Sequence, residues 1–362
     1  MPILVSKAQV PDHEALNKRF ARLLETAWFT NRGEMVRELE ERLAEYLGVH
    51  HVVAVSSGTV GIQALIKALG LCGNVVTTPF TFIATASAVK WEGLEVAFAD
   101  IDSKAWNLDA NRVAERVDDD TAAIMPVHVF GNPCRVDDFQ QLAVSRELPI
   151  IYDAAHAFGV RRNGNSILNA GNASVLSFHA TKLFHTVEGG AVITNDESLA
   201  ADVRKRINFG ITGPESIECV GINGKMSEFH AAMGLCLLPE MDRHIAKREM
   251  LAEIYRTELS ELVEFQQWSE GATNNYGYQP VLLRSESEVK RVQEALGKEQ
   301  IVPRRYFYPS LDSLDFLQAT DICPVSRDVA SRILCLPMYP DLDEKDCRMI
   351  GRLMVDAIDS AR

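Results

Sequence analysis

The chain has 362 residues, of which 47% are hydrophobic, and a formal net charge of −13. That length allows one large and one small lobe, and the acidity argues against a nucleic-acid surface, which needs a basic stripe. The seven cysteines are scattered without a CxxC pair, which favours reduced thiols over disulfides or a zinc site. The N-terminus lacks a signal-peptide pattern, and no apolar run is long enough to span a bilayer. We therefore expect a cytoplasmic protein that binds neither nucleic acid nor membrane and holds no metal.

The expected secondary structure begins with an N-terminal arm, residues 1–14, and with helical apolar spacing within 13–29 and 34–48. From His51 onward, short β-branched runs alternate with helical segments, which indicates βαβ units. The expected strands lie within 51–57, 74–80, 94–101, 122–130, 149–155, 174–180 and 190–196. The predicted fold class is α/β, with a mainly parallel mixed sheet covered by helices.

The last third of the chain has a different pattern. A long helical stretch from Met226 is interrupted at Pro239, and the segments after it predict a smaller α+β lobe. We therefore divide the chain into the arm, a large lobe over 15–240 and a small C-terminal lobe over 241–362.

Two common nucleotide-binding loops are absent: no GxGxxG follows the first strand, and GxxxxGK[ST] does not occur. In a parallel α/β sheet, ligands bind beyond the carboxyl ends of the strands. "SSGT", from Ser56 to Thr59, falls at such an end, directly before a helix. Its amides and the hydroxyls of Ser57 and Thr59 can bind a phosphate, although the same residues also suit a plain helix N-cap.

Asp153 follows an apolar strand in "PIIYDAAHA". A buried carboxylate is costly without a partner, so Asp153 either caps the next helix or faces a cation in the crevice. His156 lies three residues on, where it is either structural or orients that carboxylate.

Lys182 lies among apolar residues in "SFHATKLFHTVEGG". Such a lysine either crosses the edge of a core to reach solvent or is a desolvated amine with a lowered pKa, which is nucleophilic towards a carbonyl.

Together these features meet the demands of pyridoxal 5′-phosphate (PLP), which needs its phosphate anchored, its pyridine nitrogen kept protonated and its aldehyde held by an amine. Phe80 and Phe82, after the second strand, are candidates to lie over the ring or to fill the core.

At this point the sequence resembles the DegT-type sugar-nucleotide aminotransferases among the fold-type-I PLP enzymes. The resemblance covers almost the whole chain, in order. It rests on "WFTNRGEMVRELEERLAEYLGV", "VSSGTVGIQALIKALG", "TTPFTFIATASAV", "DIDSKAWNLD", "MPVHVFGNPC", "YDAAHAFG", "SFHATKLFHTVEGGAVITND" and "GINGKMSEFHAAMG".

The resemblance implies a set of residue roles. Lys182 forms the Schiff base and shuttles the proton, Asp153 pairs with the pyridinium, and His156 lies beside the cofactor. Asn223 reaches the phosphate from a neighbouring subunit, which implies a homodimer with shared active sites. The implied cofactor contacts are Ser57, Gly58, Thr59, Phe82, Asp153, His156, Ser177, His179, Lys182 and Asn223.

The implied reaction is a ping-pong transamination from glutamate to a keto sugar nucleotide, of the kind used in O-antigen or lipopolysaccharide biosynthesis. "IVPRRYFYPSLDSL" resembles the segment of enzymes that act at C4 of dTDP-4-keto-6-deoxyglucose, which favours dTDP-4-amino-4,6-dideoxyglucose as product. A C3-aminotransferase and a non-catalytic regulatory or sensor protein remain as alternatives. The expected substrate contacts, which are otherwise surface or packing residues, are Thr30, His185, Lys225, Arg304, Tyr306 and Tyr308.

Overall fold

The computed structural model describes residues 2–359. Two hydrogen-bonded groups of strands form the central sheet, in the orders β2-β10-β9-β6 and β4-β3-β5. Parallel bridges, Ile124 to Ile150 and Val127 to Asp153, join β5 to β6 and make the sheet continuous. Its strands are β2 (His51–Val55), β3 (Asn74–Thr77), β4 (Glu95–Phe98), β5 (Thr121–Met125), β6 (Ile151–Asp153), β9 (Ala173–Ser177) and β10 (Gly190–Thr194).

The strand directions confirm the predicted mixed sheet. β10 runs antiparallel to β2 and β9, whereas the other paired strands of this sheet run parallel. Because β10 returns beside β9, the loop that carries Lys182 lies between two adjacent strands.

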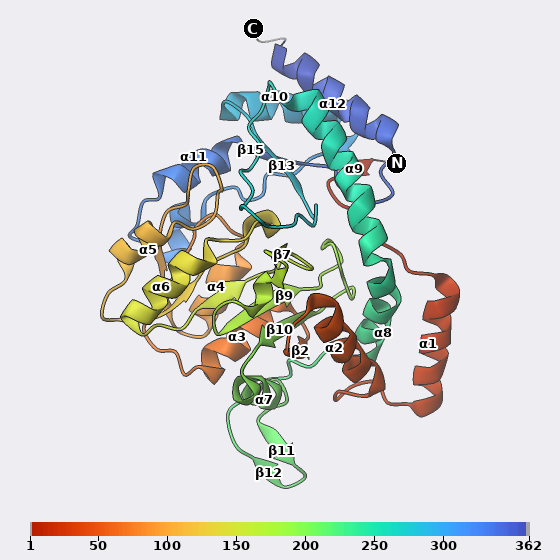
Figure 1. Ribbon diagram of the computed structural model, residues 1–362, viewed down its shortest axis with the longest axis vertical. Helices are drawn as coiled ribbons and strands as arrows, with labels where there is room; N and C mark the ends of the chain where they lie inside the picture. The colour runs from red at the N-terminus through yellow and green to blue at the C-terminus, as the bar shows by residue number, and fades with distance from the viewer. Residues whose placement is uncertain (1, 360–362) are drawn as a thin grey trace.

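Helices cover both faces of the sheet, as predicted (Figure 1). Side chains alternate between the faces, so Val53 and Val55 pack with α3 while Val52 and Ala54 pack with α2. The covering helices are α2 (Glu34–Leu47), α3 (Gly58–Ala68), α4 (Ala84–Trp91), α5 (Ala110–Arg116), α6 (Val136–Arg146), α7 (Glu197–Arg206) and α8 (Glu228–Leu237).

The C-terminal part has a core of its own. One short turn of helix, Leu238–Glu240, contains Pro239 and separates α8 from α9 (Met241–Leu259), so the predicted interruption is confirmed. β13 (Gln279–Leu282) and β15 (Ile333–Leu336) pair antiparallel. The helices around them are α10 (Glu286–Lys298), α11 (Pro324–Arg332) and α12 (Glu344–Asp359). The division into lobes at 240 stays a prediction, and residues 1 and 360–362 of the outer ranges lie outside the described residues.

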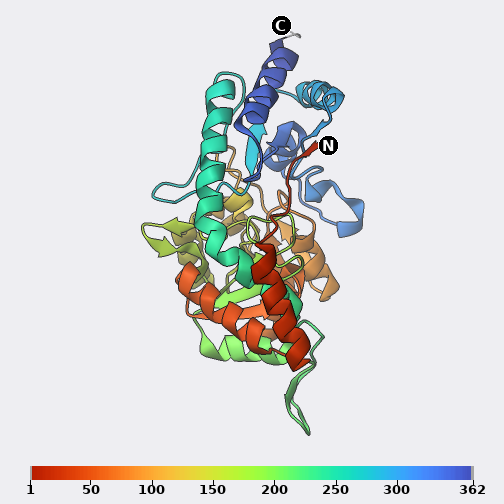
Figure 2. The same cartoon turned by 90° about the vertical axis from the view of Figure 1, so that its right-hand side faces the viewer.

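The N-terminal arm crosses between the two parts of the molecule. β1 (Ile3–Leu4) pairs with β14 (Ile301–Val302) of the C-terminal part. α1 (His13–Thr26) then packs along α8 beside the main sheet (Figure 2). The arm and α1 together therefore link both cores, although residues 1–14 carried no predicted strand.

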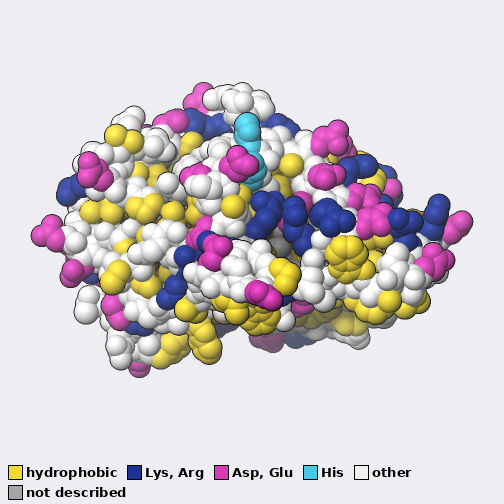
Figure 3. Space-filling model, turned by 90° about the horizontal axis from the view of Figure 1, so that it is seen from below, with side chains coloured by type: hydrophobic (Ala, Val, Ile, Leu, Met, Phe, Trp, Pro, Cys, Tyr) yellow, Lys and Arg dark blue, Asp and Glu magenta, His cyan; other side chains and the backbone are white. Residues whose placement is uncertain are grey.

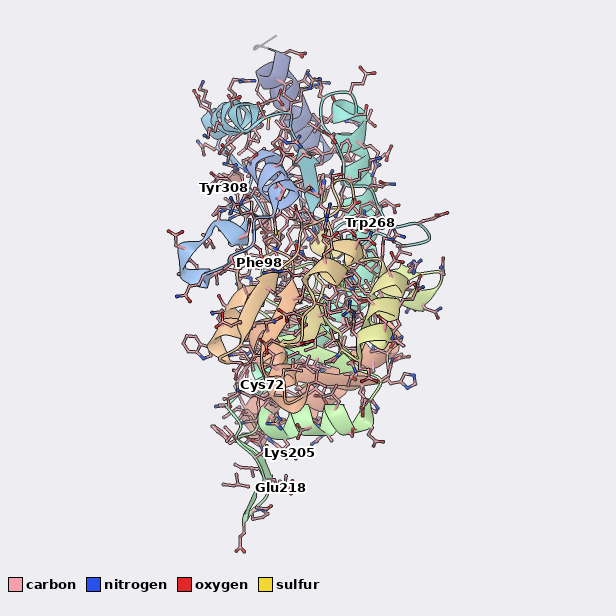
Figure 4. All side chains as sticks on the ribbon, turned by 90° about the vertical axis from the view of Figure 1, so that its left-hand side faces the viewer. Cys72, Phe98, Lys205, Glu218, Trp268 and Tyr308 are labelled. Atoms are coloured by element: carbon pink, nitrogen blue, oxygen red, sulfur yellow. The ribbon has the colours of Figure 1, made fainter. Side chains whose placement is uncertain are left out.

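A hairpin that the sequence pattern did not predict projects beyond α7 (Figure 1). It consists of β11 (Ile211–Gly213) and β12 (Ser216–Ile217). An ion pair of 3.4 Å between Lys205 Nζ and Glu218 Oε2 joins its base to α7 (Figure 4). The remaining short elements are β7 (Arg161–Arg162), β8 (Asn165–Ser166) and 3-10 turns at Val129–Gly131, Ile167–Asn169, Leu311–Ser313 and Asp315–Leu317.

Within residues 2–359, no helix combines the length and apolar character needed to cross a bilayer. The same residues contain no cluster of His, Cys, Asp and Glu arranged to hold a metal ion.

Candidate active site

A cavity of about 320 Å³ opens where β6 and β9 end and α3 begins. The loop between β9 and β10 contributes Lys182, and the C-terminal part contributes Tyr278, Arg304 and Tyr306 to its wall. The cavity therefore lies at the carboxyl edge of the sheet, where parallel α/β folds bind ligands, and the C-terminal part closes one side.

Lys182 points its amine into this cavity. Its Nζ donates a hydrogen bond of 3.1 Å to the phenol oxygen of Tyr278 and lies 5.7 Å from the centre of that ring. Burial lowers the pKa of Lys182 to about 8, while the charge of Asp153 acts in the opposite direction. An amine with this pKa is substantially neutral near pH 8, which makes it a good nucleophile.

Asp153 ends β6 and is buried, with 6% of its surface exposed. Its Oδ2 accepts a hydrogen bond of 2.7 Å from Thr85 Oγ1, and its Oδ1 accepts one of 3.1 Å from the amide of Ala155. Thr85 Oγ1 lies 2.9 Å from Thr81 Oγ1, so a pair of hydroxyls on and before α4 supports the carboxylate. These bonds orient Asp153 along the cavity wall, where it can face a cation.

His156 lies beside Lys182 in a shell of rings. The amide of Phe130 donates to His156 Nδ1 at 3.1 Å, and the centre of the Tyr278 ring is 4.4 Å away. Burial, with a smaller contribution from the charge of Lys182, lowers the pKa of His156 well below its ordinary value. The imidazole is therefore neutral, with its free Nε2 as the possible donor.

The N-terminus of α3 closes the opposite side of the cavity. Ser57 caps this helix by accepting a hydrogen bond of 3.2 Å from the amide of Val60, so the N-cap interpretation is correct for its side chain. Thr59 and Ser177 also line the cavity. A Cβ atom on Gly58 would lie 3.3 Å from Ser177 Cβ, so this glycine lets the helix start close to the end of β9.

The mouth of the cavity carries Phe82 and His179. Phe82 is 55% exposed, whereas most phenylalanine side chains are buried in a core. His179 Nδ1 lies 2.8 Å from Thr181 Oγ1, and its Nε2 lies 3.6 Å from Glu188 Oε1.

This donor set fits PLP. The free amides at the start of α3, with Thr59 and Ser177, suit a dianionic phosphate. Asp153 suits a pyridinium, Lys182 an aldehyde, and Phe82 presents an exposed ring face.

Some residues expected in the site lie elsewhere. His185 is buried, its Nε2 lies 2.9 Å from the carbonyl oxygen of Gln9, and its Nδ1 accepts from the amide of Val187 at 3.2 Å. Both ring nitrogens are engaged outside the cavity, which corrects the expected sugar contact of His185. Tyr308 lies outside the cavity lining, where its ring packs 3.5 Å from the guanidinium of Arg305 (Figure 4).

Three further expected contacts are also outside the cavity of this chain. Lys225 lines a second cavity of about 110 Å³ with Arg32 and Arg204, and its Nζ lies 4.7 Å from the centre of the Phe209 ring. Asn223 forms a backbone bridge with Asn208. Thr30 is exposed, and its carbonyl oxygen accepts a hydrogen bond of 2.7 Å from Trp28 Nε1.

Positive charge is unevenly distributed on this acidic chain. Lys and Arg side chains gather near the middle of the face that is viewed from below, the end of the molecule where α7 lies (Figures 1 and 3). α7, which lies at this end, carries three basic residues in its last turn, Arg204, Lys205 and Arg206.

Sequence reasoning missed Tyr278 and Thr85. Thr85 lies three residues after Phe82 in a quoted motif, so helical spacing alone could have placed it beside the cavity. Tyr278 lies 96 residues after Lys182 and has no local signal.

The mixed α/β fold is that of the fold-type-I PLP-dependent aminotransferases, and this donor set fits their cofactor. The chain belongs to the DegT/DnrJ/EryC1/StrS aminotransferase family, whose model matches residues 11–354. It is 39% identical to the dTDP-4-amino-4,6-dideoxy-D-glucose transaminase of Shigella dysenteriae, over 94% of this chain and 95% of the relative. It is 30% identical to the GDP-perosamine synthase of Escherichia coli O157:H7, over 92% and 94% of the two chains.

A solved structure agrees with these relatives. DesI, crystallised in the presence of its TDP-sugar product, superposes with a TM-score of 0.94 at 36% identity and covers 99% of this chain and 94% of its own. The predicted family, fold class, aminotransferase activity and PLP dependence are therefore confirmed.

Proposed function

We propose that the protein moves an amino group from glutamate to C4 of dTDP-4-keto-6-deoxyglucose and so forms dTDP-4-amino-4,6-dideoxyglucose. The observation that carries the proposal is the Lys182 amine, directed into a cavity that also contains Asp153 and the start of α3. The similarity to the Shigella dTDP-4-amino-4,6-dideoxy-D-glucose transaminase supports the sugar, and the similarity to DesI, crystallised with its TDP-sugar product, supports the nucleotide.

The proposed residue roles follow from the geometry. PLP, when bound, supplies an aldehyde that exchanges amines and a ring that accepts electrons. Asp153 holds a proton on the ring nitrogen by its negative charge, and the α3 N-terminus with Ser177 binds the phosphate. Lys182, with its lowered pKa, takes and returns the proton that moves during amine transfer.

Arg304 and Tyr306 are the proposed substrate contacts in this chain. Both line the mouth of the cavity, and the Arg304 guanidinium donates a hydrogen bond of 3.3 Å to the Tyr306 oxygen. Arg304 is exposed, and its guanidinium lies 5.4 Å from the centre of the Tyr306 ring. A guanidinium in this position suits a diphosphate or a donor carboxylate.

The dimer remains part of the proposal. Thr30, Asn223 and Lys225 lie outside the cavity of their own chain, so they can serve a cofactor and substrate only in the cavity of a second copy. Several large apolar side chains near them are exposed, among them Phe209 at 46% and Ile222 at 43%. Sedimentation at equilibrium tests the dimer, and Asn223→Ala should weaken PLP binding if the sites are shared.

The substrate is tested with purified protein, PLP, glutamate and four sugars: the dTDP- and GDP-linked 4-keto-6-deoxy sugars and their 3-keto isomers. Mass spectrometry and NMR identify the aminated product and its position. We expect amination of the dTDP-linked 4-keto sugar, with Lys182→Ala inactive as control. A preference for the GDP sugar, as in the name of the perosamine relative, or for a 3-keto sugar would overturn the substrate assignment.

A yellow holoenzyme that bleaches on addition of glutamate supports the donor independently of the sugar. The expected cytoplasmic location and the place in surface-polysaccharide biosynthesis also remain proposals.

A further inference from the structure

The Lys182 amine is hydrogen-bonded to Tyr278. The Tyr278 oxygen accepts the 3.1 Å hydrogen bond from Nζ, and the Tyr278 ring contacts His156 at 4.4 Å and Tyr306 at 5.8 Å between ring centres. Three separate segments of the chain thus surround one phenol. Burial raises the pKa of this phenol, so its oxygen stays protonated and neutral near pH 7.

Two buried polar side chains fix the backbone just before Tyr278. Arg248 on α9 is 2% exposed, and its Nη1 donates to the carbonyl oxygens of Gly277 at 3.2 Å and Met338 at 2.9 Å. Asn275 is equally buried, and its Nδ2 donates to the carbonyl oxygens of His156 at 2.8 Å and Phe158 at 3.0 Å. Burying a guanidinium costs free energy unless its N–H groups are hydrogen-bonded. Because any movement of this segment would break these bonds, they hold the backbone before Tyr278 rigid.

Asn275 also connects the two segments that carry Tyr278 and His156. It ties the segment of Tyr278 to the loop that follows His156, and its Oδ1 accepts a hydrogen bond of 3.0 Å from the amide of Gly277. The phenol oxygen and the imidazole consequently keep their positions relative to each other and to Lys182.

We propose that Tyr278 is a positioning residue for Lys182, which holds the free amine over the cavity while that amine is not covalently engaged. A lysine side chain has four rotatable bonds, and one fixed acceptor restricts the amine to the geometry that proton transfer needs. This inference rests on the proposed role of Lys182 and is independent of the sugar.

The titratable and charged groups around Lys182 all affect its pKa, so a test must change only one of them. Asp153, His156, Tyr278 and Tyr306 surround the amine, and His179, Glu188 and Arg304 line the outer cavity. Tyr278→Phe removes only one oxygen. Because a hydrogen bond from an ammonium is stronger than one from a neutral amine, its loss should lower the pKa of Lys182 by about half to one unit.

The test compares wild type, Tyr278→Phe and Tyr276→Phe. Tyr276 is a matched control, since its oxygen donates to Glu249 at 3.0 Å away from the cavity. In PLP-free protein, the pH dependence of Lys182 labelling by an amine-reactive ester, followed by peptide mass spectrometry, reports the pKa. In the PLP-loaded protein, the bleaching rate at saturating glutamate and the glutamate concentration for half-maximal rate are measured.

We expect Tyr278→Phe to lower the labelling pKa and to slow bleaching about 10- to 100-fold, with a change below threefold in the half-saturating glutamate concentration. Tyr276→Phe should match wild type in both. An unshifted labelling pKa together with a bleaching rate within twofold of wild type would overturn the inference. Failure of wild type to bleach with glutamate would instead count against the proposed donor, so the two failures are distinguishable.

Discussion

Thr85 donates a hydrogen bond of 2.7 Å to the carboxylate of Asp153, and this contact joins α4 to the end of β6. Within residues 2–359, the one other hydrogen-bond donor to this carboxylate is the amide of Ala155, at 3.1 Å. Thr85 therefore controls the rotation of the group that is proposed to pair with the PLP ring.

Thr85→Val should weaken PLP binding about tenfold, because a hydrogen bond to a charged group contributes about 1.5–3 kcal/mol and only part of that loss falls on the ligand. Titration of PLP-free protein with PLP, followed by absorbance, measures the effect. Thr194→Val is the control, since Thr194, at the end of β10, is also buried and donates at 2.7 Å to the carbonyl oxygen of Asn172. Equal PLP affinities in both variants would contradict this role.

Lys182→Met should stabilise the PLP-free protein, most strongly at neutral pH. Burial lowers the pKa of Lys182 to about 8 from an ordinary 10.5, so between these values the unfolded chain binds more protons than the folded one. The free energy of unfolding of the wild type therefore rises with pH through this window. Below pH 8 the folded protein bears the whole cost of burying the charged lysine, up to about 3 kcal/mol. The Met variant lacks this penalty.

Urea unfolding of both proteins between pH 7 and pH 10.5 tests the direction of this pH dependence. The difference in free energy of unfolding between the variant and the wild type should be largest at pH 7 and should shrink as pH approaches 10.5. Lys298→Met, at an exposed position of α10, is the control for the loss of a lysine outside the cavity. A constant Lys182→Met gap over the whole range would refute the linkage.

Glu228→Ala should destabilise the fold by about 2–4 kcal/mol. The Glu228 carboxylate is fully buried and accepts hydrogen bonds of 2.7 Å from the amides of Gly33 and Met35, at the start of α2. Its removal leaves buried donors unpaired. Chemical unfolding measures the loss, and the exposed pair of Glu34 with Arg22 supplies a control, since Glu34→Ala should change stability by less than about 1 kcal/mol. Similar losses in the two variants would be inconsistent with this role.

Gly190→Ala should disrupt both the fold and PLP binding. A Cβ at residue 190 would lie 2.6 Å from the amide nitrogen of Gly58 and 2.7 Å from the carbonyl oxygen of Leu176, so β10 or the start of α3 must move. Gly297→Ala is the opposite control. Residue 297 lies in α10, and a Cβ atom there would have no other atom within 4 Å. The alanine should therefore increase the free energy of unfolding by about 0.5–1 kcal/mol. Thermal melts with and without PLP distinguish these outcomes, and an unaltered melt for Gly190→Ala would contradict the packing argument.

Arg304→Met should raise the KM for the keto sugar about tenfold or more, because it removes an exposed guanidinium at the cavity mouth. Steady-state kinetics at saturating glutamate measure the change. Lys298→Met is again the control, with KM unchanged. An unaltered KM for Arg304→Met would remove Arg304 from the substrate site.

Much of the fold was predictable because its signals are local. The alternation of β-branched runs and helical segments predicted the strands that build the sheet, and the break at Pro239 separated α8 from α9. The hairpin after α7 and the pairing of β1 with β14 were not predicted, because two- and three-residue strands leave no periodic pattern.

The site was predictable to the extent that its residues follow strands. Asp153, Lys182 and the start of α3 stand at the carboxyl ends of β6, β9 and β2, and parallel strands bring those ends to one edge. His185 illustrates the limit. Its motif lines the cavity at Lys182 and again at Glu188, but His185 between them faces the carbonyl oxygen of Gln9, from the N-terminal segment.

The sequence by itself determined the strands and covering helices of the main sheet and the family, and it predicted the residues that are proposed to bear the chemistry, since each depends on neighbours along the chain. Only the tertiary structure decided which side chains surround the amine. Tyr278 reaches Lys182 because Arg248 and Asn275 hold its segment against the sheet. Such contacts between distant segments arise from packing and from the pairing of buried polar groups, which have no periodicity in the sequence.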